Sequence, residues 1–328
     1  MTVHETPVQQ KPHSAIRHAD KVHAETVLID WMLGNACSYA CSYCPKALHD
    51  GSLGWQSAAD IMSFYGMLKA HYVDALQRRV WIQFTGGEPT MHPKIIPLLD
   101  AASDSGFSVS LISNGSRTRR FWERIAPHLN SVILTYHEEF VEHSAFRELL
   151  GVLASKMPVQ VNVTLHPARF EATYGRAQDL AQTVPEATFV LKPLRVDFGT
   201  ELYGYTREQA QRMGIRLTRP RREEVATPRG VMMVSDASGG ETRWRGSDLL
   251  RLGRNDWQGW ICSAGLESLR IKADGSITRA VCGVGGHIGK LGEDVELPVT
   301  PVRCSMSRCA CNADILISRQ RHMGPVPG

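Results

Sequence analysis

Between residues 26 and 193, six short apolar segments rich in β-branched residues alternate with segments of helical apolar spacing. The apolar segments are VLIDW, VWIQF, FSVSLI, SVILT, VQVNVTL and ATFVLK, at residues 27–31, 80–84, 107–112, 131–135, 159–165 and 187–192. Strands that alternate with amphipathic helices predict right-handed βαβ units and a parallel sheet. A partial barrel and a doubly wound sheet both satisfy this α/β pattern, and both bind ligands at the carboxyl ends of the strands.

The chain has 328 residues, 43% of them hydrophobic, so it can bury a full core and exceeds the usual size of one domain. The alternation stops after residue 193. Two short strands then surround an Asp-Gly turn in ESLRIKADGSITRAV, which is a strong hairpin signal. We therefore expect an N-terminal extension (1–25), a strand–helix domain (26–199), a linker with short strands (200–261) and a small C-terminal domain built on a β-hairpin and helix (262–328).

Charge and hydropathy exclude some classes of partner. The net charge of +4 is too small to indicate nucleic-acid binding, and the arginine run at residues 212–222 ends in two glutamates, as solvated loops do. No apolar run approaches the roughly 20 residues of a membrane span, and the N-terminus lacks the apolar segment of a signal peptide. We expect a cytoplasmic protein with reduced thiols, no membrane partner and no nucleic-acid partner.

The eight cysteines fall into two groups separated by more than 200 residues. NACSYACSYCP holds the first group, Cys37, Cys41 and Cys44, and the second group is Cys262, Cys282, Cys304, Cys309 and Cys311. Reduced cysteine clusters indicate metal or redox chemistry rather than disulfides.

Three interpretations fit the first group. Buried structural thiols would suit the helical spacing, but Gly34 and Pro45 bracket a loop. Structural zinc needs four ligands, and His49 is the one nearby candidate for the fourth. Three thiolates on a 4Fe–4S cluster would leave one iron open to another molecule.

Two further motifs stand beside these cysteines. Tyr43 precedes the third cysteine, and TGGEP at 85–89 follows the second strand, about forty residues beyond the cysteines. SNGS at 113–116 ends the third strand. In this combination the sequence resembles the radical S-adenosylmethionine (radical SAM) superfamily over roughly residues 25–195.

That resemblance implies a partial (β/α)6 TIM-like barrel. It also implies that Cys37, Cys41 and Cys44 hold a 4Fe–4S cluster whose open iron binds SAM, and that a flavodoxin- or ferredoxin-type donor supplies electrons. Glycines allow close backbone approach, and a carboxylate suits an ammonium group. The residues that the resemblance assigns to SAM are Tyr43, Gly86, Gly87, Glu88, Ser113, Asn114 and Thr164.

The second cysteine group resembles part of a SPASM or twitch domain, which carries auxiliary iron–sulfur clusters. Cys262-x19-Cys282 encloses the hairpin, and Cys304-x4-Cys309-x-Cys311 adds three thiols. Four ligands close a cubane, so we expect one auxiliary 4Fe–4S cluster for electron transfer or substrate binding, with one of the last three cysteines spare. Structural zinc is the alternative.

For the reaction itself, the candidate catalytic residues are His137 and Glu138, which follow a strand end, and Tyr203 in ELYGYT, which could donate a hydrogen atom or line the pocket. The 25 N-terminal residues are too few for the leader-peptide reader of peptide-modifying relatives, so we expect a small-molecule substrate or a separately delivered peptide. Hydrogen abstraction is the expected reaction, with transfer of a SAM fragment or epimerisation as alternatives. A structural metal-binding, RNA-binding protein is the alternative of another class, and it gives no role to the Gly-Gly-Glu motif.

Overall fold

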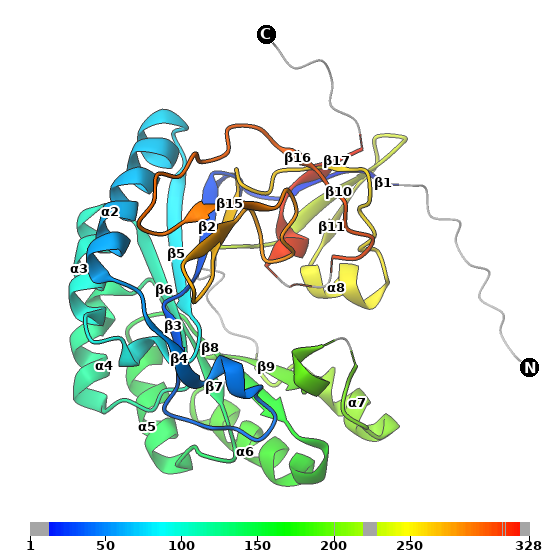
Figure 1. Cartoon of the computed structure of the whole chain (residues 1–328). Coiled ribbons are helices and arrows are strands. Elements are labelled where there is room, and N and C mark those ends of the chain that lie inside the picture. Colours follow the sequence, from blue (N-terminus) through cyan, green and yellow to red (C-terminus); the bar gives the residue numbers. More distant parts are fainter. Residues whose placement is uncertain (1–12, 200, 219–227, 310, 312, 322–328) are drawn as a thin grey trace, which may run out of the picture.

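The computed structural model describes residues 13–199, 201–218, 228–309, 311 and 313–321 (Figure 1). Its largest sheet has nine strands in the order β15-β14-β13-β2-β5-β6-β7-β8-β9. The strands from β2 to β9 in this order run parallel to one another, so the sheet has the expected βαβ connections.

All six strands expected in the first half of the chain form. They are β2 (Thr26–Met32), β5 (Arg79–Thr85), β6 (Ser108–Ser113), β7 (Ser131–Tyr136), β8 (Val159–Leu165) and β9 (Thr188–Pro193). One face of the sheet is covered by helices, as Figure 1 shows: α2 (Ala58–Leu68) with its π-helical continuation (Lys69–Ala75), α3 (Ile95–Asp104), α4 (Arg119–Ile125), α5 (His143–Ala154) and α6 (Phe170–Thr183). The mixed α/β fold with a parallel sheet is therefore confirmed.

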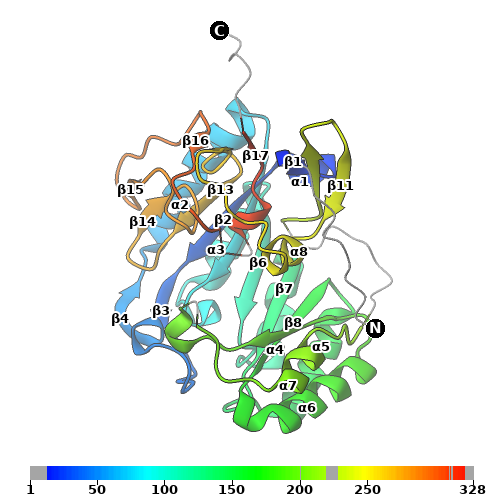
Figure 2. The same cartoon turned by 90° about the vertical axis from the view of Figure 1, so that its right-hand side faces the viewer.

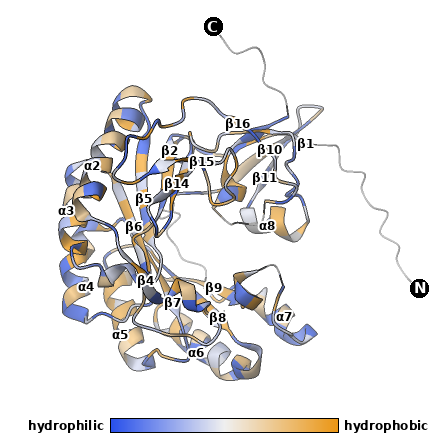
Figure 3. Ribbon diagram, viewed as in Figure 1, coloured by the Kyte–Doolittle hydropathy of each residue, from blue (hydrophilic) through white to orange (hydrophobic). Residues whose placement is uncertain are grey.

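The two faces of this sheet differ in burial. Along β8, Val159, Val161, Val163 and Leu165 are buried in the main core, whereas the residues between them are half-buried. The same alternation occurs along β9 and in the second half of β2, β5 and β7. Successive side chains of a strand point to opposite faces. The helix-covered face is thus a packed core, and the opposite face, called here the inner face, keeps partial access. Figure 3 shows hydrophobic residues concentrated along the central strands.

The predicted Asp-Gly hairpin forms, and it extends the large sheet. Strand β13 (Ser268–Ile271) pairs with β14 (Ser276–Thr278) across the turn, where Gly275 has a φ of +83°. Strand β13 also lies parallel to β2, and β14 pairs with β15 (His287–Lys290). The C-terminal hairpin is therefore continuous with the first parallel strand.

A second sheet assembles strands from both ends of the chain (Figure 2). Its order is β11 (Glu241–Trp244), β10 (Met232–Asp236), β1 (His13–His18), β17 (Arg319–Gln320), β12 (Ile261–Cys262) and β16 (Val302–Arg303). The segment expected as a linker contributes β10 and β11, together with the helices α7 (Arg207–Met213) and α8 (Gly246–Arg251). From the arginine run, Arg212 lies in α7 and pairs with Glu171 at 2.7 Å, while its residues after 218 lie outside the described part.

Within the described ranges, no helix combines the length and apolar character that crossing a bilayer requires.

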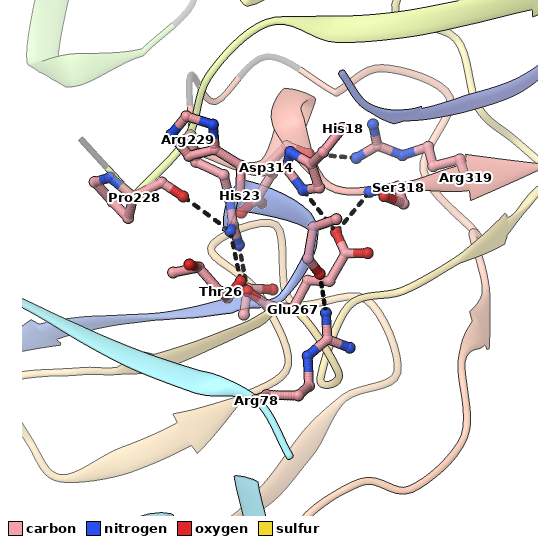
Figure 4. Close-up of polar contacts among 12 residues, drawn as sticks. His18, His23, Thr26, Arg78, Pro228, Arg229, Glu267, Asp314, Ser318 and Arg319 are labelled. Carbon is pink, nitrogen blue, oxygen red and sulfur yellow. Dashed lines mark hydrogen bonds and ion pairs between the residues drawn. The ribbon is translucent and has the colours of Figure 1, made fainter. Parts of the chain in front are cut away.

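A network of buried charges joins the two sheets (Figure 4). Arg229 donates to the carbonyl oxygens of Thr26, at 3.0 Å, and Glu267. The Glu267 carboxylate accepts hydrogen bonds from Ser318 N at 2.9 Å and pairs with His18 Nε2 at 3.2 Å. Burial alone would raise the pKa of Glu267, but the hydrogen bond from His18 and the charges of His18 and Arg229 lower it below its ordinary value. The carboxylate is therefore held ionised where the N-terminal strand meets the large sheet.

We predict that Glu267→Gln lowers the free energy of unfolding by about 3 kcal/mol, the cost of breaking a buried charge pair. Because the folded pKa is lowered, this stabilisation is present above the unfolded carboxyl pKa near 4.5 and is lost as pH falls through the folded value. Urea unfolding at pH 7 checks the prediction. Glu241→Gln is the control, because Glu241 pairs with Arg17 at the exposed surface and should cost less than about 1 kcal/mol. Equal losses in both variants would contradict the account.

Candidate functional site

The first three cysteines lie on a loop that the surrounding backbone holds firmly. The loop leaves β3 (Gly34–Ala36) and enters a short helical turn, η1 (Lys46–Leu48), before β4 (Asp50–Trp55) returns to pair with β3. Asn35 closes the loop, because its amide donates to Ala47 O at 3.0 Å and to Asp50 Oδ1 at 2.8 Å. This loop, residues 37–44, is called the cysteine loop below.

The three thiols of the cysteine loop are partly withdrawn from water. Cys41 is buried, and Cys37 and Cys44 are half-buried. Burial raises the pKa of all three thiols, that of Cys41 to about 11. They are therefore protonated at neutral pH in the metal-free chain, and a metal centre would have to release those protons on binding. Cys37 Sγ already accepts hydrogen bonds from Tyr39 N at 3.4 Å and Asn114 Nδ2 at 3.6 Å.

The two glycines of the TGGEP motif bring the end of β5 against β3. Their φ angles are +83° and +47°, in the region that favours glycine. A Cβ atom on Gly86 would lie 2.7 Å from Gly34 O, and one on Gly87 would lie 2.1 Å from Ala36 O. From the sequence, we expected the two glycines to let the backbone approach a ligand closely. In the structure, they instead let it approach the backbone of β3, which leads into the cysteine loop.

Glu88 links three segments through its backbone N and its fully buried carboxylate. Its backbone N donates to Ala36 O at 2.8 Å. Its Oε1 accepts from Ser113 Oγ at 2.8 Å and from the backbone and hydroxyl of Thr90 at 3.1 and 2.5 Å, and its Oε2 accepts from Asn114 N at 2.7 Å. Burial raises the pKa of Glu88 against these hydrogen bonds. The carboxylate thus ties the TGGEP turn to the SNGS turn, and the Glu88 backbone N holds the end of β3, from which the cysteine loop leaves.

Tyr43, His137 and Thr164 meet although they come from the cysteine loop, the end of β7 and β8. Tyr43 Oη lies 2.7 Å from His137 Nδ1 and 3.1 Å from Thr164 Oγ1, and the rings of Tyr43 and His137 stack. Burial lowers the pKa of His137 to about 4, so the imidazole is neutral at pH 7. Three residues that the sequence selected independently therefore form one contact at the carboxyl edge of the sheet.

The other sequence candidates lie around this contact at different depths. Glu138 forms an ion pair with Arg169 at 3.1 Å, away from the thiols. Its neighbour Glu139 instead accepts hydrogen bonds from the backbone and hydroxyl of Ser42, at 2.7 and 2.5 Å. Tyr203 packs in a small apolar cluster with residues of the cysteine loop, including Cys41 and Tyr43. The adjacent acidic pair offered no sequence signal for which glutamate would reach the loop.

The second cysteine group gathers in the second, smaller core. Cys262, Cys304 and Cys309 are buried there among Trp257, Trp260 and Ile315, and Cys282 packs against them. Cys309 lies within electrostatic reach of both Cys262 and Cys311. The chain therefore brings together thiols spread over residues 262–311.

Two charged residues that sequence analysis did not select accompany these thiols. Arg319 donates a hydrogen bond to Cys309 Sγ at 3.5 Å, and Asp314 accepts hydrogen bonds from Cys282 N at 2.7 Å and Val281 N at 3.2 Å. Both side chains are almost fully buried. Burial and the Asp314 carboxylate raise the pKa of Cys309, and the Arg319 guanidinium lowers it only in part, so this thiol, like those of the cysteine loop, would release a proton on binding a metal centre. The one sequence signal that could have indicated Arg319 or Asp314 was its charge beside the apolar residues near the end of the chain.

In the described part of the chain, no three His, Cys, Asp or Glu side chains are close enough to hold a single metal ion. A zinc ion draws its ligands to about 2.3 Å from one centre, whereas a cubane distributes its thiolates over separate irons. The donors in both cysteine groups are thiols, which suit iron–sulfur clusters and zinc alike.

No family model matches the chain. Two curated relatives, both named S-adenosylmethionine-dependent nucleotide dehydratase, share short stretches with it. The protein from Selenomonas ruminantium is 34% identical over 84 residues, and that from Fibrobacter sp. (strain UWH6) is 25% identical over 97 residues. These matches cover 24% and 29% of this chain but only 27% and 29% of the relatives, less than a third of their length.

Among solved structures, native anSMEcpe with bound AdoMet superimposes with a TM-score of 0.50 and 14% identity over 82% of this chain and 79% of that chain. This likeness concerns the fold. Beyond the fold, the chain is similar to S-adenosylmethionine-dependent proteins in the short stretches that it shares with the two curated relatives.

We predict that Gly87→Ala disorders the cysteine loop, because the added methyl group would lie 2.1 Å from Ala36 O. The iron bound after anaerobic reconstitution should fall by about four atoms per chain relative to the unmodified protein, one cubane's worth. Gly54→Ala is the matched control. Gly54 also has a positive φ, +67°, but a Cβ atom there meets nothing within 4 Å, so that variant carries the backbone strain without the clash. Unchanged iron content in Gly87→Ala would disprove the role of the close approach.

Proposed function

We propose that this chain binds a 4Fe–4S cluster through Cys37, Cys41 and Cys44 and uses it to cleave SAM reductively. When bound, the cluster supplies one electron to the SAM sulfonium, whose cleavage gives methionine and a 5′-deoxyadenosyl radical that takes a hydrogen atom from a substrate C–H bond. The observation that carries the proposal is the placement of Glu88, whose buried carboxylate binds the SNGS turn and whose backbone N binds Ala36 O, where the chain enters the cysteine loop.

The chain's own part in this reaction is to bind and orient. Oε1 of Glu88 accepts three hydrogen bonds and Oε2 accepts one among the described contacts, so Oε2 retains an acceptor position for the ammonium group of SAM. Asn114 Nδ2 donates to Ser38 Oγ at 3.0 Å, within the cysteine loop. We propose that the SNGS turn binds the ribose from this position, with Ser113 and Asn114 as its polar groups.

Tyr43 and Thr164 would border the adenosyl part of SAM. Their mutual hydrogen bond fixes the tyrosine ring over the carboxyl edge of β8, and His137 stacks on that ring. His137 is neutral, and its Nδ1 lies within hydrogen-bonding distance of Tyr43 Oη. We therefore propose that His137 orients Tyr43. Tyr203 remains a candidate for the substrate side, and Glu138, through its pair with Arg169, a candidate at the rim.

The second cysteine group would hold one auxiliary 4Fe–4S cluster, for electron transfer or substrate binding. Arg319 and Asp314 support this proposal, since they place a cation at one thiol and anchor the backbone of another. No contact among the described residues distinguishes which cysteine is not a ligand of this cluster: Cys304, Cys309 or Cys311. A flavodoxin- or ferredoxin-type protein would supply the electrons.

For the substrate, we propose a small molecule or a peptide. The names of the two curated relatives favour a nucleotide among small molecules, and dehydration of a nucleotide is the second candidate function. Transfer of a SAM fragment and epimerisation are alternative outcomes of the same radical.

We predict that Cys41→Ala abolishes formation of 5′-deoxyadenosine, because the buried thiol at the centre of the motif is lost. The assay is anaerobic reconstitution, reduction with dithionite and chromatographic detection of 5′-deoxyadenosine from added SAM. Cleavage at the wild-type rate would refute the assignment of the first cluster.

The matched variant in the second group is Cys282→Ala. It should retain cleavage of SAM, because Cys282 lies in the smaller core, but it should lose about four irons per chain. Iron content equal to that of the wild type would leave Cys282 without a role as a ligand.

A further inference from the structure

We propose that Lys192 binds an anionic group of the substrate, a phosphate or a carboxylate, on the inner face of the large sheet. This inference rests on the proposed function and names the substrate class of the same site.

The strand register places Lys192 beside the SAM-binding contact. On β9, Lys192 pairs with Thr164 of β8, and neighbouring strands lie about 4.8 Å apart. Thr164 Oγ1 lies 3.1 Å from Tyr43 Oη, which belongs to the cysteine loop. Leu191, the preceding residue, is buried in the main core, so alternation along the strand puts Lys192 on the inner face with Thr164.

Lys192 also faces the second cysteine group. The charge of Cys311, as a thiolate, would act on the Lys192 ammonium, so the two side chains are electrostatic neighbours. Cys311 lies likewise within electrostatic reach of Asp30 on β2. The lysine is therefore between the cysteine loop and the C-terminal thiols, where a substrate would have to lie to meet both centres.

The ammonium group has no neutralising partner among the described residues. No hydrogen bond or ion pair joins it to another side chain there, whereas the Asp30 carboxylate on the same face of the sheet is paired with Arg270. A half-buried cation without a counter-ion is costly, and an anion that enters this face would remove the cost.

The rest of the inner face suits a hydrogen-bonding ligand. Asn162 is two residues before Thr164 on β8, and Gln83 and Thr85 end β5; all are half-buried. Asn162 Oδ1 accepts from Gln160 Nε2 at 2.8 Å, which orients the Asn162 amide with its N–H groups available. A polar floor that carries the Lys192 ammonium indicates a hydrophilic, anionic molecule rather than an apolar peptide side chain.

The experiment titrates sodium pyrophosphate and, separately, sodium citrate into the reconstituted full chain by calorimetry, without SAM. Pyrophosphate binding would identify a phosphate as the anion, and citrate binding a carboxylate. For the anion that binds, Lys192→Met should raise the dissociation constant at least tenfold, and Lys192→Arg should keep it within about threefold. Lys290→Met is the matched control, an exposed lysine on the edge strand β15 that should leave the affinity unchanged.

Two results would overturn the proposal: neither anion binds the wild type, or Lys192→Met binds as the wild type does. If Lys192→Met loses iron on reconstitution while anion affinity stays the same, the lysine instead balances the charge of the thiols, which also overturns it. The proposed function fails separately, through absence of 5′-deoxyadenosine with anion binding intact.

Discussion

The buried carboxylate of Glu88 is the interaction on which the site depends. A fully buried carboxyl group is tolerated when donors surround it, and four donors do so here, two from Thr90 and two from the SNGS turn. The adjoining backbone bond to Ala36 O and the glycine close approach then fix where the cysteine loop begins. Thiols, turn and strand ends share one rigid support, and rigid placement is what the proposed radical chemistry would need.

The two faces of the large sheet differ in what covers them. Helices bury one face, while the inner face keeps half-buried polar side chains, of which Lys192 lies within electrostatic reach of Cys311 in the second cysteine group. The hairpin β13–β14 and strand β1 bring that second group close without a separate interface, since β13 pairs with β2 and β1 pairs with both β10 and β17. Two thiol-rich regions distant in sequence thereby flank one accessible surface.

The parallel strands, the hairpin and the meeting of Tyr43 with Thr164 could be predicted, because strand periodicity is local and carboxyl ends of parallel strands share an edge. The second sheet could not. Its pairing of β1 with β10 and β17 joins residues more than 200 positions apart, and such registers leave no local signal. Arg319 and Thr90 were missed for the same reason, since a single charged or hydroxyl side chain gains its partner only through tertiary packing. Whether Glu138 or Glu139 contacts the cysteine loop depends on the direction of the backbone after β7, which composition does not encode.

The proposed function depends most on one property of the first cluster: three thiolates leave an iron open to SAM. Electron paramagnetic resonance of the dithionite-reduced, reconstituted protein tests this most directly, in the Cys282→Ala background so that one cluster contributes. We expect a 4Fe–4S signal whose g values shift when SAM is added, because the amino and carboxylate groups of SAM bind the open iron. A cluster signal that SAM leaves unchanged would contradict the proposed function.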